Sequence, residues 1–386
     1  MLSDHDIHDT AILKCLAITA IVFHNFFHFV SAARENEVTF DPVRFRLFLE
    51  AVRQPSLAIQ AVFSFFGHFG VQIFIFLSAY GLAKSHWDRP PGWTTFMAGR
   101  IRKLFPEFGL IVLPWFIALI VSVGLMTAIK RAGLQFVLMF AGLSPFVPGY
   151  SVPLIGPWWF IPFILQFYAI WPILRRLTLR FGWPGLAVLS IVCVAIARIA
   201  DPMLAHWSVS LFLTPLGSMP VLCFGIVAAR YSFRITAPIA LSACAILLLG
   251  SVNVAVWPAT FLAALLVALW LYEKARGRLR KYPVLERIGH YSCLVFLLNG
   301  MVRNQIVPFA HSPSSQLVFG FVSAVVSFAI AGIIYEFRLS GKRSTERGPS
   351  VAARANLSIS PRATIEPDSP GSMAVRKLAQ MQLGPR

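Results

Sequence analysis

The sequence predicts an all-α polytopic membrane protein with about ten transmembrane helices. Hydrophobic residues make up 57% of its 386 residues and charged residues only 13%, whereas a soluble domain carries about 25% charged residues. The mean hydropathy is correspondingly high, at +0.70. Apolar runs that are long enough to cross a bilayer, which takes about 20 residues each, recur along the chain.

Ten apolar runs are the candidate spans. They cover residues 11–31, 66–83, 105–127, 157–174, 182–199, 210–229, 236–253, 256–272, 287–307 and 316–337. The first run has no basic segment before it and no small-residue cleavage site after it, so we predict a permanent helix and not a signal peptide. The five cysteines lie in apolar runs without CxxC or metal-site spacing, so neither disulfides nor zinc are expected.

The formal net charge of +18 indicates membrane topology, because most Lys and Arg residues lie in short loops between apolar runs. If the N-terminus is cytoplasmic, the cytoplasmic loops carry most of these charges. We therefore expect both termini in the cytoplasm, a lipid bilayer around the chain and no nucleic-acid partner. From residue 338 onward, polar and basic residues replace the apolar runs. This change predicts a membrane domain over 1–337 and a disordered basic cytoplasmic tail over 338–386.

The first span contains ionisable residues, which inside a membrane are candidates for function. His24 follows Lys14 by ten residues, which places it about 15 Å further along a helix, near the middle of the bilayer. A neutral imidazole there could take a proton from a hydroxyl group. It could equally be a histidine that only hydrogen-bonds to a neighbouring helix. His28 shares a face with His24, but without an acidic residue nearby we predict no metal site and expect His28 to assist or to pack.

Two other stretches carry polar groups. Arg100 and Lys103 stand three positions apart before the third span, so they can point the same way and bind phosphates, or simply form a positive flank. Trp159 begins the fourth span, where tryptophan commonly anchors a helix at the interface. Gln166 and Tyr168 follow inside that span, where they line a cavity or hydrogen-bond between helices.

Four stretches in order resemble the acyltransferase 3 family of bacterial integral-membrane acyltransferases. They are Leu13 to His24, with a basic residue ahead of a histidine; Gly70 to Leu82, similar to "GVxxFFxLSGxxL"; Arg100 to Pro106, similar to "RxxRxxP"; and Trp159 to Pro172, similar to "WF…Y…P". Ile288 to Asn299 is a weaker fifth match. The chain departs from the family pattern at Lys14 and Lys103, where arginine is usual, at Ala79 and at Asn299.

The resemblance implies an acyltransferase of the bacterial inner membrane. Its donor would be an acyl-CoA, usually acetyl-CoA, which acts as a substrate and not as a tightly bound cofactor. Its acceptor would be a sugar hydroxyl of a polysaccharide or a lipid-linked saccharide. His24 then takes the catalytic place with Lys14, and Arg100 and Lys103 take the place of CoA phosphate contacts. The candidates for the substrate cavity are His28, Gln72, Ser78, Trp159, Gln166, Tyr168 and Asn299.

A membrane carrier or flippase for a lipid or sugar is the alternative function. Intramembrane Lys14, His24 and Gln166 could serve transport equally well. Transporters often contain inverted repeats with paired broken helices, and no repeat of fixed period is visible in this sequence. The acyltransferase is therefore the leading interpretation.

Overall fold

The computed structural model describes residues 6–347 apart from 32 and 232, and in these residues it contains helices and no strands. The all-α prediction is confirmed. The chain divides into two compact units, and the boundary falls between Tyr335 and Glu336. The predicted tail falls mostly on residues 348–386, which lie outside the described residues.

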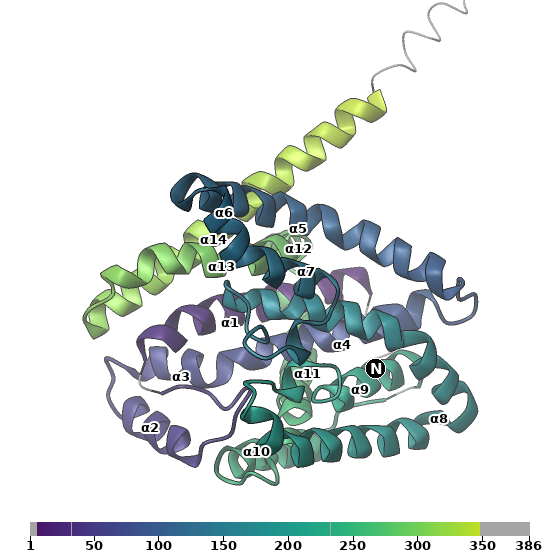
Figure 1. Cartoon of the computed structure of the whole chain (residues 1–386). Helices are drawn as coiled ribbons and strands as arrows, with labels where there is room; N and C mark the ends of the chain where they lie inside the picture. Colours follow the sequence, from purple (N-terminus) through teal and green to yellow (C-terminus); the bar gives the residue numbers. More distant parts are fainter. Residues whose placement is uncertain (1–5, 32, 232, 348–386) are drawn as a thin grey trace, which may run out of the picture. The chain divides into compact units, whose positions relative to one another are not determined.

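Fourteen α-helices, joined by short 3₁₀ and π turns, make up this part of the chain (Figure 1). They are α1 (Ile7–Val30), α2 (Pro42–Val52), α3 (Ala58–Phe66), α4 (Gly70–Ser85), α5 (Trp93–Val123), α6 (Leu125–Ala128), α7 (Leu134–Phe140), α8 (Phe160–Ala205), α9 (Met219–Arg230), α10 (Ala237–Val252), α11 (Thr260–Leu279), α12 (Pro283–His290), α13 (Ser292–Ile306) and α14 (Pro313–Arg347).

Within the described residues, six helical segments are long and apolar enough to cross a membrane. They are Ile7–Val30, Ala58–Ser85, Trp93–Val123, Gly156–Ala205, Trp257–Leu279 and Pro313–Ser340, with α9 and α10 as shorter apolar helices. Two predicted spans, 157–174 and 182–199, both fall in α8, whose backbone leaves the helical region at Gly182 with φ 64°. The predicted span 287–307 is divided between α12 and α13. The count of about ten spans and the cytoplasmic termini stay predictions.

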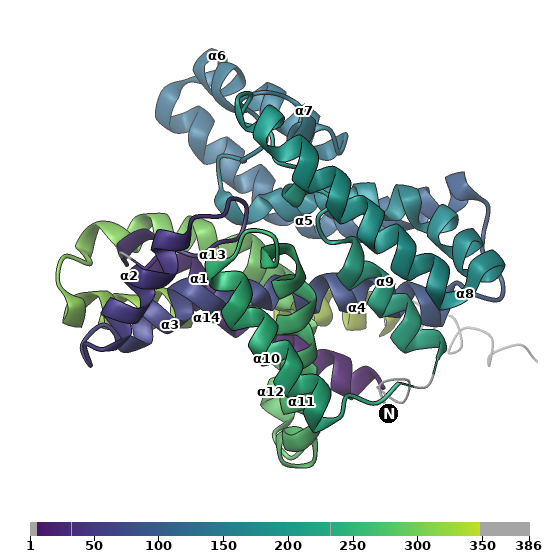
Figure 2. The same ribbon diagram turned by 90° about the horizontal axis from the view of Figure 1, so that it is seen from below.

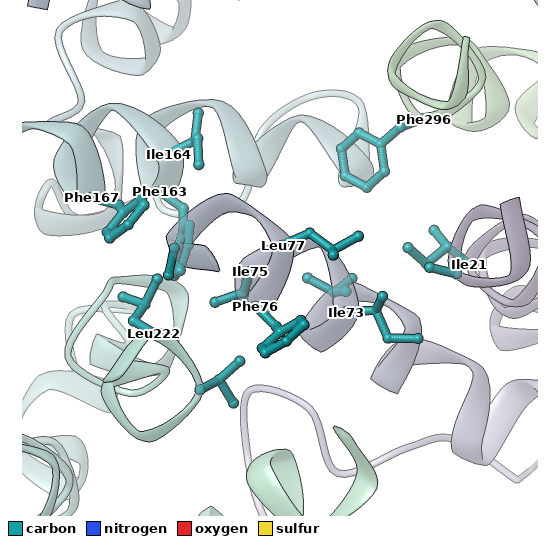
Figure 3. Close-up of a cluster of buried hydrophobic side chains, with 14 of the residues drawn as sticks. Ile21, Ile73, Ile75, Phe76, Leu77, Phe163, Ile164, Phe167, Leu222 and Phe296 are labelled. Carbon is teal, nitrogen blue, oxygen red and sulfur yellow. The ribbon is translucent and has the colours of Figure 1, made fainter. Parts of the chain in front are cut away.

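Helix α4 lies in the middle of the largest hydrophobic core, between α1, α8, α9 and α13 (Figure 3). Its sequence is apolar on nearly every side, as expected of a helix that is surrounded by others. Figures 1 and 2 both show α1 running alongside α3 and α4. The labelled core side chains are Ile21 from α1, Ile73, Ile75, Phe76 and Leu77 from α4, Phe163, Ile164 and Phe167 from α8, Leu222 from α9 and Phe296 from α13.

The N-terminal end of α1 is held in place by a buried carboxylate. Asp9 is fully buried and accepts hydrogen bonds from the Tyr272 hydroxyl at 2.6 Å and from Arg280 Nε at 2.8 Å. Arg276 also pairs with it. A buried carboxylate is tolerated only when its oxygens are paired in this way. These bonds tie α1 to α11 and fix the position of α1 along its axis.

Helix α12 crosses α1 at a glycine. A Cβ atom added to Gly289 would lie 1.9 Å from the carbonyl oxygen of Ala11, which is backbone and cannot move aside. We predict that Gly289→Ala lowers the free energy of unfolding by about 1–3 kcal/mol, as overpacking typically does. The measurement is the midpoint of thermal unfolding of the purified protein in detergent. Gly277→Ala is the control, because no atom lies within 4 Å of that position; an equal effect at both glycines contradicts the prediction.

Candidate active site

A cavity of about 330 Å³ lies beside the C-terminal half of α1. Polar and charged side chains from α1, from the loop that follows it and from α13 share its wall with aromatic and aliphatic ones. The lining residues are Ile21, His24, Asn25, His28, Phe29, Arg34, Glu35, Glu37, Val38, Thr39, Arg44, Val71, Val152, Gly156, Pro157, Trp159, Leu213, Phe296 and Arg303. Ile21 and Phe296 also belong to the core in Figure 3, so the cavity borders a rigid support.

His24 has a defined tautomer. Its buried ring places Nδ1 3.0 Å from the carbonyl oxygen of Ser64 and 3.3 Å from that of Phe63. A carbonyl oxygen can only accept a hydrogen bond, so Nδ1 must carry the proton and donate it. In the neutral ring Nε2 then holds a free lone pair. His24 is therefore prepared to accept a proton at Nε2 or to attack a carbonyl carbon with it.

A glycine permits this hydrogen bond. A Cβ atom added to Gly67 would lie 2.7 Å from Cβ of His24 and 2.8 Å from the carbonyl oxygen of Ala20. No side chain fits in that space, so the end of α3 can approach α1 this closely only because position 67 is glycine. The approach brings the α3 carbonyl groups within reach of the His24 ring.

His28 and Glu35 are hydrogen-bonded to each other next to His24. His28 Nδ1 lies 2.6 Å from Glu35 Oε2, and the rings of His24 and His28 have centroids 5.6 Å apart. Burial by itself would raise the pKa of Glu35, but the pKa is lowered to about 2, chiefly by the hydrogen bond from His28. Arg44 holds the Glu35 loop through its carbonyl oxygen at 2.6 Å. The cavity thus contains a fixed negative charge beside the His24 ring.

The sequence argument against a metal overlooked Glu35. The ligand atoms of His24, His28 and Glu35 lie within 4.8 Å of one another, which is a spacing that a divalent cation can bridge. In the structure, however, the hydrogen bonds to Ser64 and between His28 and Glu35 already account for the positions of these side chains. The absence of a metal site stays a prediction.

Amide and guanidinium groups also line the cavity. Asn25 Nδ2 donates to Asn299 Oδ1 at 2.7 Å, so the candidate Asn299 orients a cavity residue and does not line the cavity itself. Arg303 is 4% exposed. Its Nη1 lies 3.3 Å from the carbonyl oxygen of Asn25. The candidate Trp159 lines the cavity, and the preceding Trp158 donates to the carbonyl oxygen of Leu297 at 3.0 Å, which ties this segment to α13.

Four other predicted residues, Lys14, Arg100, Lys103 and Tyr168, gather near the N-terminal half of α1. His86 and Cys293, which were not candidates, lie with them, and we call these six residues the basic cluster. The Arg100 guanidinium lies over the Tyr168 ring at 5.7 Å, and its Nη2 is 2.9 Å from Nε2 of His86. Burial, and then the charges of Arg100 and Lys103, lower the pKa of His86, which favours its neutral form. Cys293 interacts electrostatically with both Lys14 and Tyr168.

Three further candidates belong neither to the cavity lining nor to the basic cluster. Ser78 Oγ donates to the carbonyl oxygen of Phe74 in its own helix at 2.8 Å. Gln166 Nε2 donates to the carbonyl oxygen of Gly142 at 2.7 Å. Gln72 is buried, and its Oε1 has no partner among the described residues.

The comparison with protein families decides the identity of the chain. The model of an acyltransferase domain matches residues 8–336, which include α1 from its second residue onward and every residue that lines the cavity. The chain belongs to the acyltransferase 3 family. No curated protein and no solved structure matched the chain.

Several residues of this acyltransferase that line or border the cavity were not candidates from the sequence. They are Asn25, Glu35, Glu37, His68 and Arg303. The ring of His68 is buried with its centroid 5.7 Å from that of His24, and neither of its nitrogens has a partner among the described residues. One signal was present: the rule that selects His24, an ionisable residue within a predicted span, also selects Arg303 in the span 287–307.

Glu37 gives the acyltransferase a testable dependence on pH. Burial, and then the negative charge of Glu35, raise the pKa of Glu37 from 4.5 to about 8. Between these values the folded protein binds a proton that the unfolded chain releases, so its stability falls as the pH rises. We predict that Glu37→Gln reduces the fall in the unfolding temperature between pH 5 and pH 8. Glu50→Gln, at an exposed position in α2, should leave it unchanged; parallel curves for Glu37→Gln and the wild type contradict the assignment.

Proposed function

We propose that this protein is a membrane-bound O-acyltransferase of the bacterial inner membrane, which transfers an acyl group, typically acetyl, from acyl-CoA to a sugar hydroxyl. The observation that carries the proposal is the His24 ring, whose Nδ1 is committed to the carbonyl oxygen of Ser64. Its Nε2 is therefore available as a base within a cavity. Membership of an acyltransferase family supplies the reaction class.

In this reaction His24 carries one proton, from the acceptor hydroxyl group to the sulfur of CoA. As the acceptor oxygen attacks the thioester carbonyl carbon, Nε2 takes the hydroxyl proton and an imidazolium forms. The C–S bond breaks, the acyl group stays on the acceptor oxygen, and the imidazolium returns its proton to the CoA sulfur. The carboxylate of Glu35, held by His28 at 2.6 Å, stabilises the transient positive charge. In a second route, Nε2 attacks the thioester carbonyl carbon, the C–S bond breaks and the CoA thiolate leaves, so that the ring carries the acyl group. The acceptor oxygen then takes the acyl group from Nε2, and its hydroxyl proton passes to the CoA thiolate, which restores the neutral ring.

The basic cluster suits the donor. Neither Arg100 nor Lys103 forms an ion pair with a carboxylate in the described part of the chain, so both charges are available to an anion. Arginine and lysine bind phosphate groups through charge-assisted hydrogen bonds. Lys14 of this cluster and His24 of the cavity both lie on α1, ten residues apart, and the pantetheine arm of CoA would extend along α1 toward the cavity.

The cavity suits the acceptor. Its volume of about 330 Å³ falls at the lower end of the range of small-molecule sites. Its lining combines polar groups, such as those of His24, Asn25 and Thr39, with the aromatic rings of Phe29 and Trp159. A sugar ring presents hydroxyl groups at its edge and C–H groups on its faces, so it can contact both kinds of side chain. A carrier or flippase could also use these residues, but it would not consume acyl-CoA.

We predict that His24→Ala removes most acyl transfer, because general base catalysis contributes about 10²–10⁴-fold. His24→Asn should be nearly as damaging, since an amide cannot take the proton. His28→Ala should retain more activity, because it loses only the partner of Glu35. The measurement is transfer of a labelled acetyl group from acetyl-CoA to a saccharide library by purified protein. Wild-type activity in His24→Ala contradicts the mechanism, and no transfer or hydrolysis by the wild type favours the carrier.

A second prediction concerns the donor. Replacing Arg100 and Lys103 together by Ala should raise the Kd for acyl-CoA about tenfold or more, because each charge-assisted contact contributes about 1.5–3 kcal/mol. Saccharide binding should not change. Arg102→Ala is the control, since Arg102 lies in the same helical turn and is exposed. If the double variant and the control bind acyl-CoA equally well, Arg100 and Lys103 serve only as positive charges that orient the chain in the membrane.

A further inference from the structure

Arg303 is a buried cation that has no counterion among the described residues. Its side chain is 4% exposed and lines the cavity. Arg303 forms no ion pair with any carboxylate of the described chain. Taking a charge out of water is strongly unfavourable unless an opposite charge or several hydrogen bonds compensate for it.

The compensation within the protein is incomplete. Nε and Nη2 donate to the same oxygen, Oδ1 of Asn304, at 3.1 and 2.7 Å, and Nη1 reaches the carbonyl oxygen of Asn25 at 3.3 Å. These acceptors are neutral. A guanidinium has one further N–H on each terminal nitrogen, and among the described residues neither of these has a partner. The Phe29 ring, 3.9 Å from the guanidinium carbon, shields one face of the group.

The carboxylates of the cavity are committed elsewhere. Glu35 pairs with His28. Glu37 lies beside Glu35, and burial together with that negative charge favours its protonated form. Neither cavity carboxylate therefore pairs with Arg303. Asn25 links Arg303 to the His24 position, because it follows His24 in α1 and its carbonyl oxygen accepts a hydrogen bond from Arg303.

We propose that the acceptor is an anionic sugar, whose carboxylate or phosphate binds Arg303 while one of its hydroxyl groups lies at His24. The inference rests on the proposed acyl transfer and specifies its substrate class. A planar guanidinium with a free N–H on each terminal nitrogen matches two oxygens of a carboxylate or phosphate. The anion supplies the negative charge that Arg303 lacks among the described residues, and its binding at Arg303 determines which hydroxyl group reaches Nε2 of His24 in the same cavity.

The test is binding without the acyl donor. Dissociation constants of glucose, glucuronate and glucose 6-phosphate are measured by ligand-observed NMR on the purified full-length protein in detergent. We expect at least one anionic sugar to bind about tenfold or more tightly than glucose, as a charge-assisted pair provides, and the two anions distinguish carboxylate from phosphate. Arg303→Met and Arg303→Gln should abolish the preference, whereas Arg303→Lys should keep part of it. Arg46→Met, at an exposed position in α2, is the matched control and should retain the full preference.

Two results would overturn the inference: equal binding of the three sugars by the wild type, or a preference that persists in a neutral Arg303 variant with wild-type elution and unfolding temperature. If neither neutral variant folds, the comparison of the three sugars on the wild type still decides. Acyl transfer is absent from this experiment, so a preference that depends on Arg303 stands even if His24 proves inactive. Equally efficient acetylation of neutral and anionic sugars would refute the inference while the proposed function remains.

Discussion

The hydrogen bond from Nδ1 of His24 to the carbonyl oxygen of Ser64 determines what this site can do, because it fixes which ring nitrogen is free. The bond depends on the close approach of α3 to α1 at Gly67. With the opposite tautomer, Nε2 would carry the proton and could neither receive one nor attack a carbonyl. The free nitrogen in the cavity thus follows from backbone packing outside it, and Glu35, hydrogen-bonded to His28, places a carboxylate near the His24 ring.

Helix α1 connects two groups of charged residues that suit different ligands. The basic cluster lies by its N-terminal half, where Arg100 and Lys103 have no carboxylate partner among the described residues. The cavity lies by its C-terminal half. Asp9 anchors α1 to α11, so the helix cannot slide between them. This arrangement suits an enzyme whose donor and acceptor approach from opposite ends and meet near His24.

The sequence allowed the helical fold and the family to be predicted, because both depend on local pattern: apolar runs and motif order. His24 was selected as an ionisable residue within a span, and the structure places it in the lining of the cavity. Glu35 was missed because only the turn of the chain after α1 brings it back to His28. Arg303 lies within a predicted span, but its contact with Asn25 joins segments that are far apart in the sequence. Gln72, Ser78 and Gln166 were predicted to line the cavity because they are polar, but they are not among its lining residues. Ser78 and Gln166 instead donate hydrogen bonds to backbone carbonyl groups. The sequence alone cannot show which face of a helix is turned toward a cavity.

The central claim is that an acyl group passes from a donor at the basic cluster to an acceptor in the cavity at the other end of α1. Proteoliposomes with the protein in one known orientation test it most directly, with labelled acetyl-CoA and the saccharide acceptor supplied on the same side or on opposite sides. We predict labelled saccharide only when the donor is on the side of Arg100 and the acceptor is on the side of Glu35. Labelled saccharide that forms when both substrates are on one side and neither is on the other would contradict the account.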